Sequence, residues 1–378
     1  MSVPRNNDSG VDEYQRPNID ERRPRTGMQL ERARRLVMRF GWNATAYQIL
    51  NPGIAHWFSE RGDAVVGYVR SGHVLVVAGA PVCSRERIAD VAAEFESFAS
   101  AAGDKVCYFG AGERLESIYR SDGEHSIVGL GAQPSWDPNG WPAIVARKAS
   151  LRAQLNRARN KGVSVSLWPP ARASGAAELR ERLAEWLETR RLPTLHFLVE
   201  PETLGRLADR RIFVAERGGS VVGFLVASPV PARDGWLIEQ IIRGKRAPNG
   251  TAELLTDSAM RSLAHEGARY ITLGLAPLSR HSSYDRLPNP LWLRATLRWV
   301  RAHGRRFYNF EGLDSFKSKF EPPCWEEITA ISYGRSFPPA SLYAIVEAFG
   351  GRSPLAFVAR ALAKAVIQEA RWLRERLP

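Results

Sequence analysis

The run WLIEQIIRGKRAPNGTAELL, residues 236–255, predicts a strand, a tight turn and a helix in direct succession. Apolar side chains fill most of the strand, which is typical of a strand buried in a sheet. Asn249-Gly250 follows Pro248, and this combination predicts a turn in which the glycine takes a positive φ. The succession therefore predicts a fold in which strands and helices alternate.

Similar elements extend outward from this run in both directions. RIFVAER (211–217) and SVVGFLVASPV (220–230) predict a hairpin around Gly218-Gly219, and YITLGLAP (270–277) predicts a further strand. The first half of the chain predicts paired strands at 64–70 and 73–82, a helix at 88–103, and strands at 105–112 and 125–138. The order of helix, antiparallel strands, helix and strand thus occurs twice, as a weak internal repeat.

Three motifs in the final third of the chain occur in a characteristic order. They are RAPNGTAELL (246–255), YITLGLAPLS (270–279) and RRFYNFEGLDSFKSKFEPPCWE (305–326). In this order and spacing they resemble the C-terminal catalytic domain of phosphatidylglycerol lysyltransferases (multiple peptide resistance factor). The resemblance extends over roughly residues 36–335.

The resemblance implies an α+β fold, a tandem of two GNAT-like acyltransferase domains with mixed sheets flanked by helices and a helical C-terminal extension. We expect a disordered basic tail at 1–27, an N-terminal GNAT-like domain at 28–137, a C-terminal catalytic GNAT-like domain at 138–335, and an amphipathic helical extension at 336–378. For residues 354–377, the sequence leaves open whether the amphipathic helix binds a membrane or packs on the core.

Members of this family move an aminoacyl group from a charged tRNA onto a membrane lipid. The resemblance therefore implies a tRNA-dependent aminoacyltransferase without a metal or cofactor, whose partners are an aminoacyl-tRNA and an anionic membrane lipid. Full-length relatives also carry a transmembrane half, whereas no run of this chain approaches the ~20 apolar residues that span a bilayer. We expect a cytoplasmic protein, peripheral at the inner face of the membrane. A separate flippase and the oligomeric state stay open.

Composition agrees with a polyanionic partner. The 378 residues carry a formal net charge of +13 with a pI near 10.0, which favours nucleic acid or an anionic membrane surface over a plain solvated surface. Cys83, Cys107 and Cys324 form no CxxC pair, so a structural zinc site is not predicted. The sequence also lacks GxSxG and HExxH motifs.

Candidate catalytic residues lie on the predicted strand and just after it. Strand alternation predicts that Glu239 and Gln240 face opposite sides of the sheet. Glu239 either grips the aminoacyl ammonium while Arg243 holds a phosphate or ester oxygen, or the two residues form a structural ion pair. Many lysyltransferases carry Asp at the position of Gln240, and this departure leaves amino-acid specificity and activity open.

The turn and the helix after it add further candidates. Asn249 and Gly250 either form a simple turn or, as the resemblance implies, border the tunnel for the aminoacyl acceptor end. Glu253, one turn into the helix, is a second candidate acid. Among the histidines, His281 is the one to test as a base.

Basic residues form two candidate phosphate-binding groups. A helix at 147–161 carries Lys148, Arg152 and Arg159 near one face, opposite an apolar stripe of Leu151, Leu155 and Ala158. It is expected to bind tRNA or lipid phosphate. Lys317 and Lys319 match the (F/Y)K-x-K-F element of the family, which makes them candidates for phosphate contact.

Two other functions remain open at this stage. The chain is either an acyl-CoA-dependent N-acyltransferase, the commoner chemistry on this fold, or a catalytically degenerate module that binds membranes or RNA. Pro248 removes one backbone donor from the loop that binds the coenzyme A diphosphate in GNAT enzymes, which argues against coenzyme A.

Overall fold

The computed structural model describes residues 27–189, 196–199, 201–282, 290–295 and 310–350. The predicted tail up to residue 26, the basic and aromatic residues 305–309, and the helix at 354–377 lie outside these ranges.

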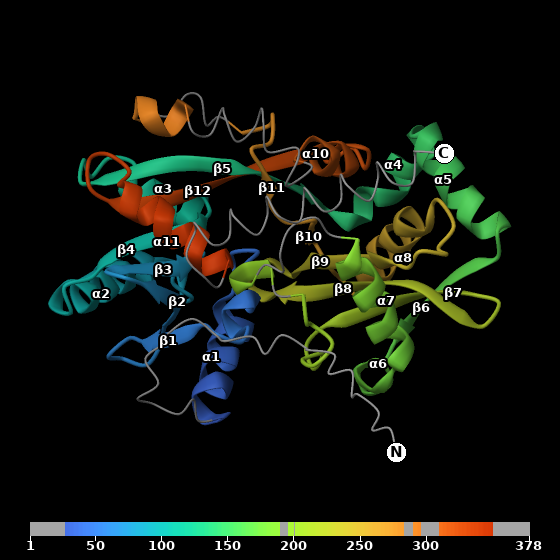
Figure 1. Ribbon diagram of the computed structural model, residues 1–378, viewed down its shortest axis with the longest axis horizontal. Coiled ribbons are helices and arrows are strands. Elements are labelled where there is room, and N and C mark those ends of the chain that lie inside the picture. The colour runs from blue at the N-terminus through green and yellow to red at the C-terminus, as the bar shows by residue number, and fades with distance from the viewer. Residues whose placement is uncertain (1–26, 190–195, 200, 283–289, 296–309, 351–378) are drawn as a thin grey trace, which may run out of the picture.

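A single mixed sheet runs through the whole described molecule, with helices packed against it (Figure 1). The strand order is β1-β2-β3-β4-β12-β5-β10-β9-β8-β7-β6, and β11 pairs with β5 beside this path. The strands are β1 (Ala55–Phe58), β2 (Val65–Ser71), β3 (Val74–Ala78), β4 (Lys105–Ala111), β5 (His125–Trp136), β6 (Val163–Trp168), β7 (Arg211–Arg217), β8 (Ser220–Val230), β9 (Gly235–Arg243), β10 (Tyr270–Thr272), β11 (Ala276–Pro277) and β12 (Cys324–Tyr333).

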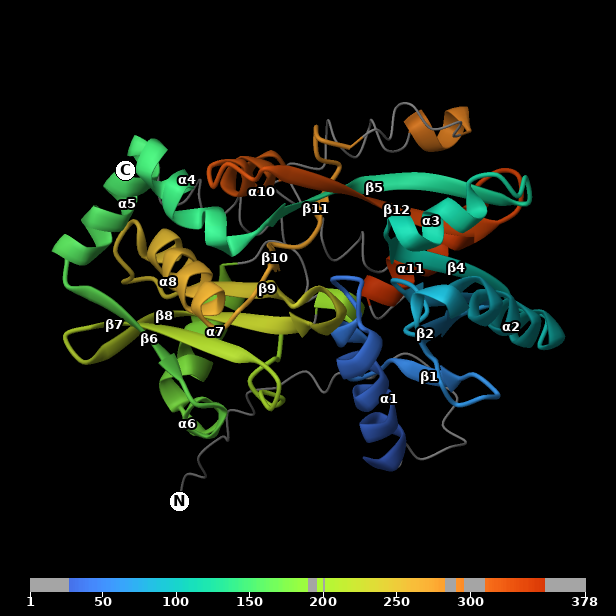
Figure 2. The same ribbon diagram turned by 180° about the vertical axis from the view of Figure 1, so that it is seen from behind.

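The helices cover both faces of this sheet, as the two opposite views show (Figures 1 and 2). They are α1 (Gly27–Phe40), α2 (Ile88–Ala101), α3 (Glu113–Tyr119), α4 (Trp141–Arg147), α5 (Ala149–Asn160), α6 (Pro170–Gly175), α7 (Ala177–Glu188), α8 (Thr251–His265), α10 (Phe310–Ser318) and α11 (Pro339–Gly350). Short 3₁₀ segments include η1 (Tyr47–Leu50), η2 (Arg85–Arg87) and η5 (Pro231–Arg233).

Two units with the same strand order make up the sheet. In the first unit, β1, β2 and β3 are antiparallel, and α2 leads to β4, which is parallel to β3. In the second unit, β6 to β9 are antiparallel, and α8 leads to β10, which is parallel to β9. This is the α+β architecture of two GNAT-like units that the sequence predicted.

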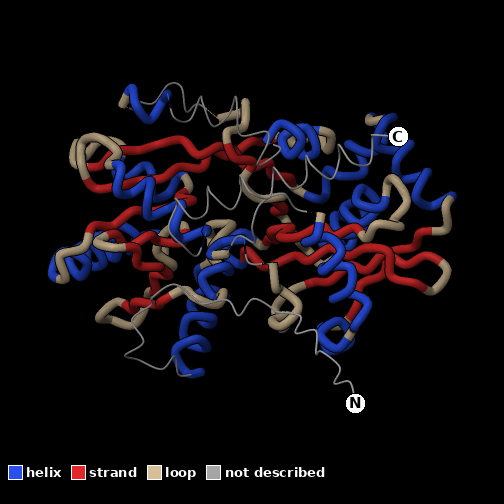
Figure 3. Tube along the Cα trace, in the orientation of Figure 1, coloured by secondary structure: helices blue, strands red, loops and turns tan. Residues whose placement is uncertain are grey.

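The units exchange their long strands β5 and β12, which are labelled in Figure 1 and seen as long strands in the same orientation in Figure 3. β5 follows the first unit in sequence, yet it pairs with β10 of the second. β12 comes last in the sheet-forming sequence, yet it pairs with β4 of the first unit. β5 and β12 pair with each other over ten residue pairs. Each unit therefore depends on the other for a neighbouring strand.

Alternating side chains place a separate core on each face of the second unit. Phe213 and Ala215 of β7 pack with α5 and α8, whereas Ile212 and Val214 pack with α6 and α7. The apolar stripe of Leu151, Leu155 and Ala158 on α5 is buried, as the sequence predicted. Gly218 and Gly219 have φ values of 55° and 76°, which confirms the predicted hairpin turn.

Two predicted elements are interrupted in the structure. The helix expected at 147–161 breaks at Lys148, whose ψ of 89° separates α4 from α5. The strand expected at 270–277 ends after Thr272, because Gly274 has a φ of 69° and turns the chain towards β11. Backbone angles outside the helical and extended regions cause both breaks.

A partly buried charge cluster joins β5 of the sheet to α2. Nδ1 of His125 lies 2.5 Å from Asp122, and Nε2 lies 3.5 Å from Glu96. Glu96 also accepts hydrogen bonds from the hydroxyls of Tyr108 and Tyr119. Burial by itself lowers the pKa of His125, but Glu96 and then Asp122 outweigh it and hold this pKa above its usual value.

The raised pKa of His125 predicts how stability depends on pH. Since protonated His125 is favoured in the folded chain, its contribution is complete below the unfolded pKa of about 6.5 and is lost as pH rises through the folded pKa. Chemical denaturation of wild type and His125→Gln at pH steps between about 5 and 8 measures this. We expect the difference in unfolding free energy to be largest at the acidic end. A difference that is constant with pH would contradict the assignment.

Candidate functional site

β9 separates from β10 soon after the two strands begin. They pair in parallel over three residue pairs, from Gly235 with Tyr270 to Leu237 with Thr272. In the first unit, the corresponding strands β3 and β4 stay paired over five. After Leu237, β9 is still paired with β8 on one edge, but it is no longer paired with β10 on the other. The sequence-predicted residues Glu239, Gln240 and Arg243 lie on this diverging part.

A β-bulge changes the direction of the side chains at this point. Val226 of β8 pairs with Gln240, and Ala227 pairs with Ile238, so Glu239 is the extra residue of β9. The side chains of Glu239 and Gln240 both contact the segment 201–210. The prediction that they face opposite sides of the sheet is therefore wrong, because a bulge interrupts strand alternation.

Glu239 forms a buried ion pair with Arg210. Nε and Nη2 of Arg210 donate to its two carboxylate oxygens over 2.9 and 3.1 Å, and both side chains are at most 5% exposed. The structural alternative that paired Glu239 with Arg243 is corrected, since Arg210 is the partner and Arg243 is exposed at the end of β9. Burial lowers the pKa of Arg210, but Glu239 outweighs this and the pKa lies above its usual value.

A network of polar contacts joins the two units beside this ion pair. Asp209 accepts hydrogen bonds from Arg34 of α1, over 2.5 and 2.7 Å, and from the hydroxyl of Tyr47 in η1, over 3.1 Å. The Arg210 guanidinium lies 4.9 Å from the centre of the Tyr47 ring. Burial raises the pKa of Tyr47 well above its usual value, so this hydroxyl stays protonated.

A pocket of about 460 Å³ opens over this network. Its walls combine α1 and η1 of the first half with α6 and the segment 205–210 of the second. Arg34, Tyr47, Asp209 and Arg210 all line it. The pocket lies at the boundary between the two units. One of its lining residues, Arg210, is the ion-pair partner of Glu239.

Gln240 is fixed by two hydrogen bonds to the segment that also carries Arg210. Its Oε1 accepts from the Thr203 hydroxyl over 3.0 Å, and its Nε2 donates to the carbonyl oxygen of Pro201 over 3.0 Å. A carboxylate at this position would lose the second hydrogen bond, because it has no N–H to donate. The amide of Gln240 therefore fits this site.

The Asn249-Gly250 turn packs directly against α5. Gly250 has a φ of 95°, as predicted, and a Cβ added there would lie 2.1 Å from the carbonyl oxygen of Gln154. The glycine thus allows both the left-handed backbone and the close approach of α8 to α5. It gives the APNG turn a structural role beside any role in binding.

In the loop between β9 and α8, three of the six backbone N–H groups of residues 244–250 donate hydrogen bonds to other protein groups, and the first N–H of α8 donates to the loop. These donors bond as follows: Gly244 to the carbonyl of Val222, Lys245 to the carboxylate of Glu185, Ala247 to the carbonyl of Gly244, and Thr251 to the carbonyl of Pro248. Pro248 has no N–H. A diphosphate cradle requires several free backbone donors, and it is disfavoured by a neighbouring carboxylate.

The remaining predicted acid and the two lysines of the KxK element lie close together. Glu253 of α8 accepts a charge-assisted hydrogen bond from Lys319. Lys317 is buried, and its Nζ donates to the carbonyl oxygens of Gly274 and Leu275 over 2.7 and 2.8 Å. Burial lowers the pKa of Lys317 to about 7. This lysine is held inside the second unit and is not presented to a phosphate at the surface.

The basic residues of the predicted phosphate-binding helix are partly engaged with protein groups. Arg159 pairs with Asp257 over 2.9 Å, and Lys148 pairs with Glu321 over 2.9 Å. Arg152 donates to the carbonyls of Val145 and Ala146 at the end of α4. Further along α5, Arg157 and Lys161 are also exposed. The helix stays a candidate polyanion surface, with its charges partly neutralised.

His281 lies against an aromatic side chain. Its ring stacks on Trp325 with centroids 4.1 Å apart and planes 8° apart, and its backbone N–H donates to the Ser279 hydroxyl. These contacts hold His281 beside β12, the strand that carries Trp325. Its test as a base stays a prediction.

Sequence reasoning missed the partners that decide this site. Asp209 and Arg210 end a loop just before a predicted strand, where charged residues are usually solvated. A second missed group is Arg233, which binds both oxygens of Glu326 over 2.7 and 2.9 Å. Asp209 and Arg210 are adjacent in the sequence ADRRIF, and this pair of opposite charges was the one local sign of an ion-pair network. No local pattern identifies the distant residues that they contact.

The described ranges contain no helix that is long and apolar enough to cross a membrane. Within the same ranges, no three His, Cys, Asp or Glu side chains are grouped as metal ligands.

Comparison with known proteins identifies relatives over most of the chain. Residues 34–329 match the family model described as phosphatidylglycerol lysyltransferase, C-terminal. A phosphatidylglycerol lysyltransferase of Bacillus subtilis (strain 168) is 26% identical over 284 residues, which are 74% of this chain and 32% of the relative. One from Staphylococcus epidermidis is 22% identical over 315 residues, 81% of this chain and 36% of the relative. The chain thus spans about a third of the length of these relatives.

Solved structures show the same fold. The crystal structure of the C-terminal domain of a putative lysylphosphatidylglycerol synthetase from Agrobacterium fabrum superposes with a TM-score of 0.73 at 25% identity, covering 86% of this chain and 98% of that one. The structure of L-PGS from Bacillus licheniformis gives a TM-score of 0.70 at 22% identity, covering 84% and 95%. With the family match over residues 34–329, these findings establish that the chain belongs to the phosphatidylglycerol lysyltransferase C-terminal family.

Proposed function

We propose that this protein transfers an aminoacyl group from a charged tRNA to a hydroxyl of an anionic membrane lipid. The observation that carries the proposal is the family match over residues 34–329, which includes β1 to β11 of both units and the first part of β12. The relatives are named phosphatidylglycerol lysyltransferases. The divergence of β9 from β10 supports it, because this is the place in the fold where a ligand can reach the backbone between parallel strands.

The reaction is an ester exchange. The lipid hydroxyl oxygen attacks the aminoacyl carbonyl carbon, the bond to the tRNA ribose oxygen breaks, and the hydroxyl proton moves to that departing oxygen. An aminoacyl ester is already activated, so positioning and stabilisation of the oxyanion supply the catalysis. No oxidation or external energy source is involved.

Arg243 is the residue we assign to the developing oxyanion, together with backbone donors near Asn249 and Gly250. Arg243 is exposed on the diverging end of β9, so its guanidinium is accessible to a substrate. Glu239 is a positioning residue in this proposal, since Arg210 occupies both of its carboxylate oxygens. Lys319 likewise holds Glu253.

The exposed end of α5 is proposed to contact tRNA phosphates. Charge reversal by Arg157→Glu with Lys161→Glu removes two exposed cations without breaking the pairs of Lys148 or Arg159. We expect weaker tRNA binding and a flatter salt dependence, because each phosphate contact contributes about 0.7–0.9 to the slope of log affinity against log salt. Filter binding of tRNA at several salt concentrations measures both.

The matched control reverses two exposed charges on the first unit, Arg61→Glu with Lys105→Glu. We expect this control to keep a salt slope closer to that of the wild type. Equal slopes for the two double variants would contradict a specific role for α5. Product formation that survives RNase treatment would remove tRNA from the reaction altogether.

The acyl-CoA alternative is disfavoured by the loop between β9 and α8. The N–H groups of Gly244, Lys245 and Ala247 already donate hydrogen bonds, and Pro248 has no N–H. The Glu185 carboxylate accepts from the Lys245 N–H, at a place where a diphosphate would need positive charge. Consumption of a CoA thioester without tRNA would restore that alternative. Salt-sensitive binding without turnover on any charged tRNA would indicate a binding module instead.

Mass spectrometry of lipid extracts tests the proposal directly. Extracts of cells with and without the protein are compared for lipids that gain the mass of an aminoacyl residue. Purified protein is then given phosphatidylglycerol vesicles and a mixture of charged tRNAs. We expect a lipid whose mass increment names the amino acid, and whose formation stops after RNase treatment. No aminoacylated lipid in either experiment would overturn the proposal.

A further inference from the structure

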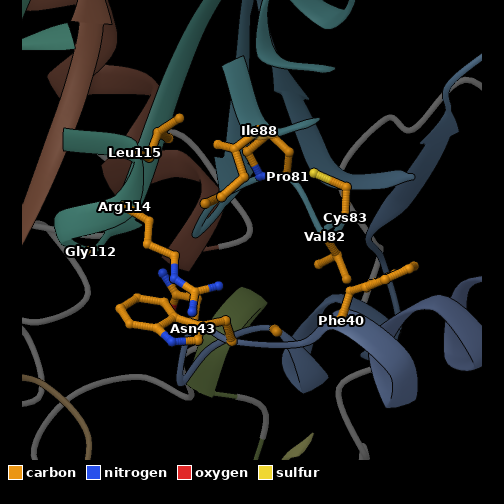
Figure 4. Close-up of a pocket in the computed structure, with 12 residues that line it drawn as sticks. Phe40, Asn43, Pro81, Val82, Cys83, Ile88, Gly112, Arg114 and Leu115 are labelled. Atoms are coloured by element: carbon orange, nitrogen blue, oxygen red, sulfur yellow. The ribbon is translucent and has the colours of Figure 1, made fainter. Parts of the chain in front are cut away.

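The two units differ at the carboxyl ends of their parallel strands. In the first unit, β3 and β4 stay paired over five residue pairs, and the pocket at their ends has a volume of only about 20 Å³ (Figure 4). In the second unit, the pairing of β9 with β10 stops after Leu237 and Thr272. Backbone hydrogen bonds set the spacing of paired strands. Other contacts therefore have to set the spacing where β9 and β10 diverge.

Helix α10 supplies such contacts to the chain that follows β10 (Figure 1). Lys317 of α10 is 4% exposed, and its Nζ donates to the carbonyl oxygens of Gly274 and Leu275 over 2.7 and 2.8 Å. The φ of 69° at Gly274 turns the chain away from the direction of β10 at this point. Lys317 thus gives this turn hydrogen bonds that β9, which has diverged, does not give it.

Two further contacts hold the same loop. Asp314, which precedes Lys317 by one turn of α10, accepts a hydrogen bond from the Ser279 hydroxyl over 2.5 Å. The N–H of Leu278 donates to the carbonyl oxygen of Leu130 in β5 over 2.9 Å. Leu278 has a φ of 53°, a conformation that a leucine keeps only where surrounding contacts hold it. The loop 274–279 therefore has its shape fixed by α10 and β5.

The second lysine of the KxK element binds the other side of the divergence. Lys319 donates a charge-assisted hydrogen bond to Glu253, in the first turn of α8, the helix that follows β9. Its Nζ also lies 4.1 Å from the centre of the Phe316 ring. Phe320 is fully buried and lies against Trp141. The end of α10 is thus anchored in the core of the second unit, and its two lysines reach opposite sides of the divergence.

The same contacts make these lysines poor phosphate ligands. The Nζ of Lys317 is buried and already used by two carbonyl oxygens, and Lys319 already has a carboxylate partner. Burial lowers the pKa of Lys317 to about 7. An uncharged amine has lost its attraction for a phosphate, but it still has two N–H groups, one for each carbonyl.

We propose that Lys317 and Lys319 form a clamp that sets the separation of β9 and β10 at the transfer site. Both lysines are then positioning residues for the reaction and do not bind phosphate. The inference rests on the proposed function, in which the aminoacyl ester is bound where these strands diverge. Because a misplacement of reacting groups by about 1 Å can lower turnover ~10²-fold, loss of the clamp should affect kcat more than tRNA binding.

A charge swap distinguishes a clamp from a phosphate contact. Lys319→Glu places two carboxylates together, Glu253→Lys places two cations together, and each should lower kcat about 10²-fold while the KM for charged tRNA changes little. The double variant restores opposite charges and should recover most of the turnover. A lysine that binds a tRNA phosphate would not be replaced in this way, because the cation of the double variant lies on α8.

The matched control breaks an ion pair at the other end of α8. Arg211 of β7 binds Glu266 over 2.9 Å, and both side chains are partly exposed, as Lys319 is. Arg211→Glu should leave kcat nearly unchanged. A loss of kcat in Arg211→Glu as large as that in Lys319→Glu would overturn the special role of the clamp.

Hydrogen exchange tests the clamp without requiring turnover. Lys317→Met keeps the length and the apolar stem of the side chain but loses both donors. Amides of residues 274–279 should exchange faster in Lys317→Met than in the wild type, whereas those of β7 and β8 should not change. Unchanged exchange of residues 274–279 in folded Lys317→Met would overturn the proposal. If Lys317→Met does not fold, exchange of residues 250–255 in Lys319→Glu and in the charge swap decides in the same way.

The clamp and the proposed reaction can fail separately. Faster exchange in Lys319→Glu that the charge swap reverses, without an aminoacyl lipid from any charged tRNA, would keep the clamp and overturn the reaction. Filter binding of tRNA covers the opposite case. If Lys319→Glu weakens tRNA binding and flattens its salt dependence, and the charge swap restores neither, Lys319 is a phosphate ligand and the clamp is overturned.

Discussion

Glu239→Gln is expected to lower the free energy of unfolding by about 3–5 kcal/mol, because it leaves the buried Arg210 guanidinium without its counter-charge. The two side chains are 5% and 3% exposed, so solvent does little to compensate. Arg210→Met should have an effect of similar size, since it leaves a buried carboxylate. Denaturation monitored by circular dichroism measures both, and activity per folded molecule is measured beside it.

The double variant Glu239→Gln with Arg210→Met should recover part of this loss, because neither charge then remains alone in the interior. Additive losses in the double variant would contradict a coupled ion pair. Normal activity per folded molecule in Glu239→Gln would assign the pair to structure alone.

Arg243→Ala serves as the contrasting variant on the same strand. Its side chain is exposed, so unfolding should change by less than about 0.5 kcal/mol. If Arg243 stabilises the oxyanion, turnover should fall at least ~10²-fold. Glu239→Gln is thus expected to lower stability, whereas Arg243→Ala, four positions along the same strand, is expected to lower turnover.

Gly250→Ala is expected to disrupt the contact between α5 and α8. The new Cβ would lie 2.1 Å from the carbonyl oxygen of Gln154, and the backbone φ of 95° already disfavours a side chain by about 1–2 kcal/mol. Since a backbone atom forms the obstacle, α5 has to move. We expect a lower melting temperature and weaker tRNA binding.

Gly162→Ala is the matched control for this variant. Gly162 has a similar φ of 77° at the end of α5, but nothing lies within 4 Å of its added Cβ. It therefore carries the backbone strain without the steric clash. The excess loss of stability in Gly250→Ala over Gly162→Ala measures the close approach of the two helices. Equal losses would show that the α5–α8 contact adapts.

Local patterns determined much of this fold. Period-two and helical patterning located the elements of both units, and the Gly218-Gly219 turn was predicted correctly. Asn249-Gly250 gave the positive φ that opens α8, and the apolar stripe of α5 is buried as expected. Each of these features depends on residues that are close together in the sequence. They can therefore be predicted without knowledge of the tertiary contacts.

The tertiary structure alone decided the arrangement of the site. The exchange of β5 and β12 joins strands nearly two hundred residues apart, and the bulge at Glu239 depends on its register against β8. Arg210, rather than the nearby Arg243, neutralises Glu239. Lys317 is buried against the carbonyls of Gly274 and Leu275. Local periodicity specifies which residues face the interior. The partner that a buried charge finds there is set by the folding of distant segments onto each other, since such a charge is stable only beside a compensating group.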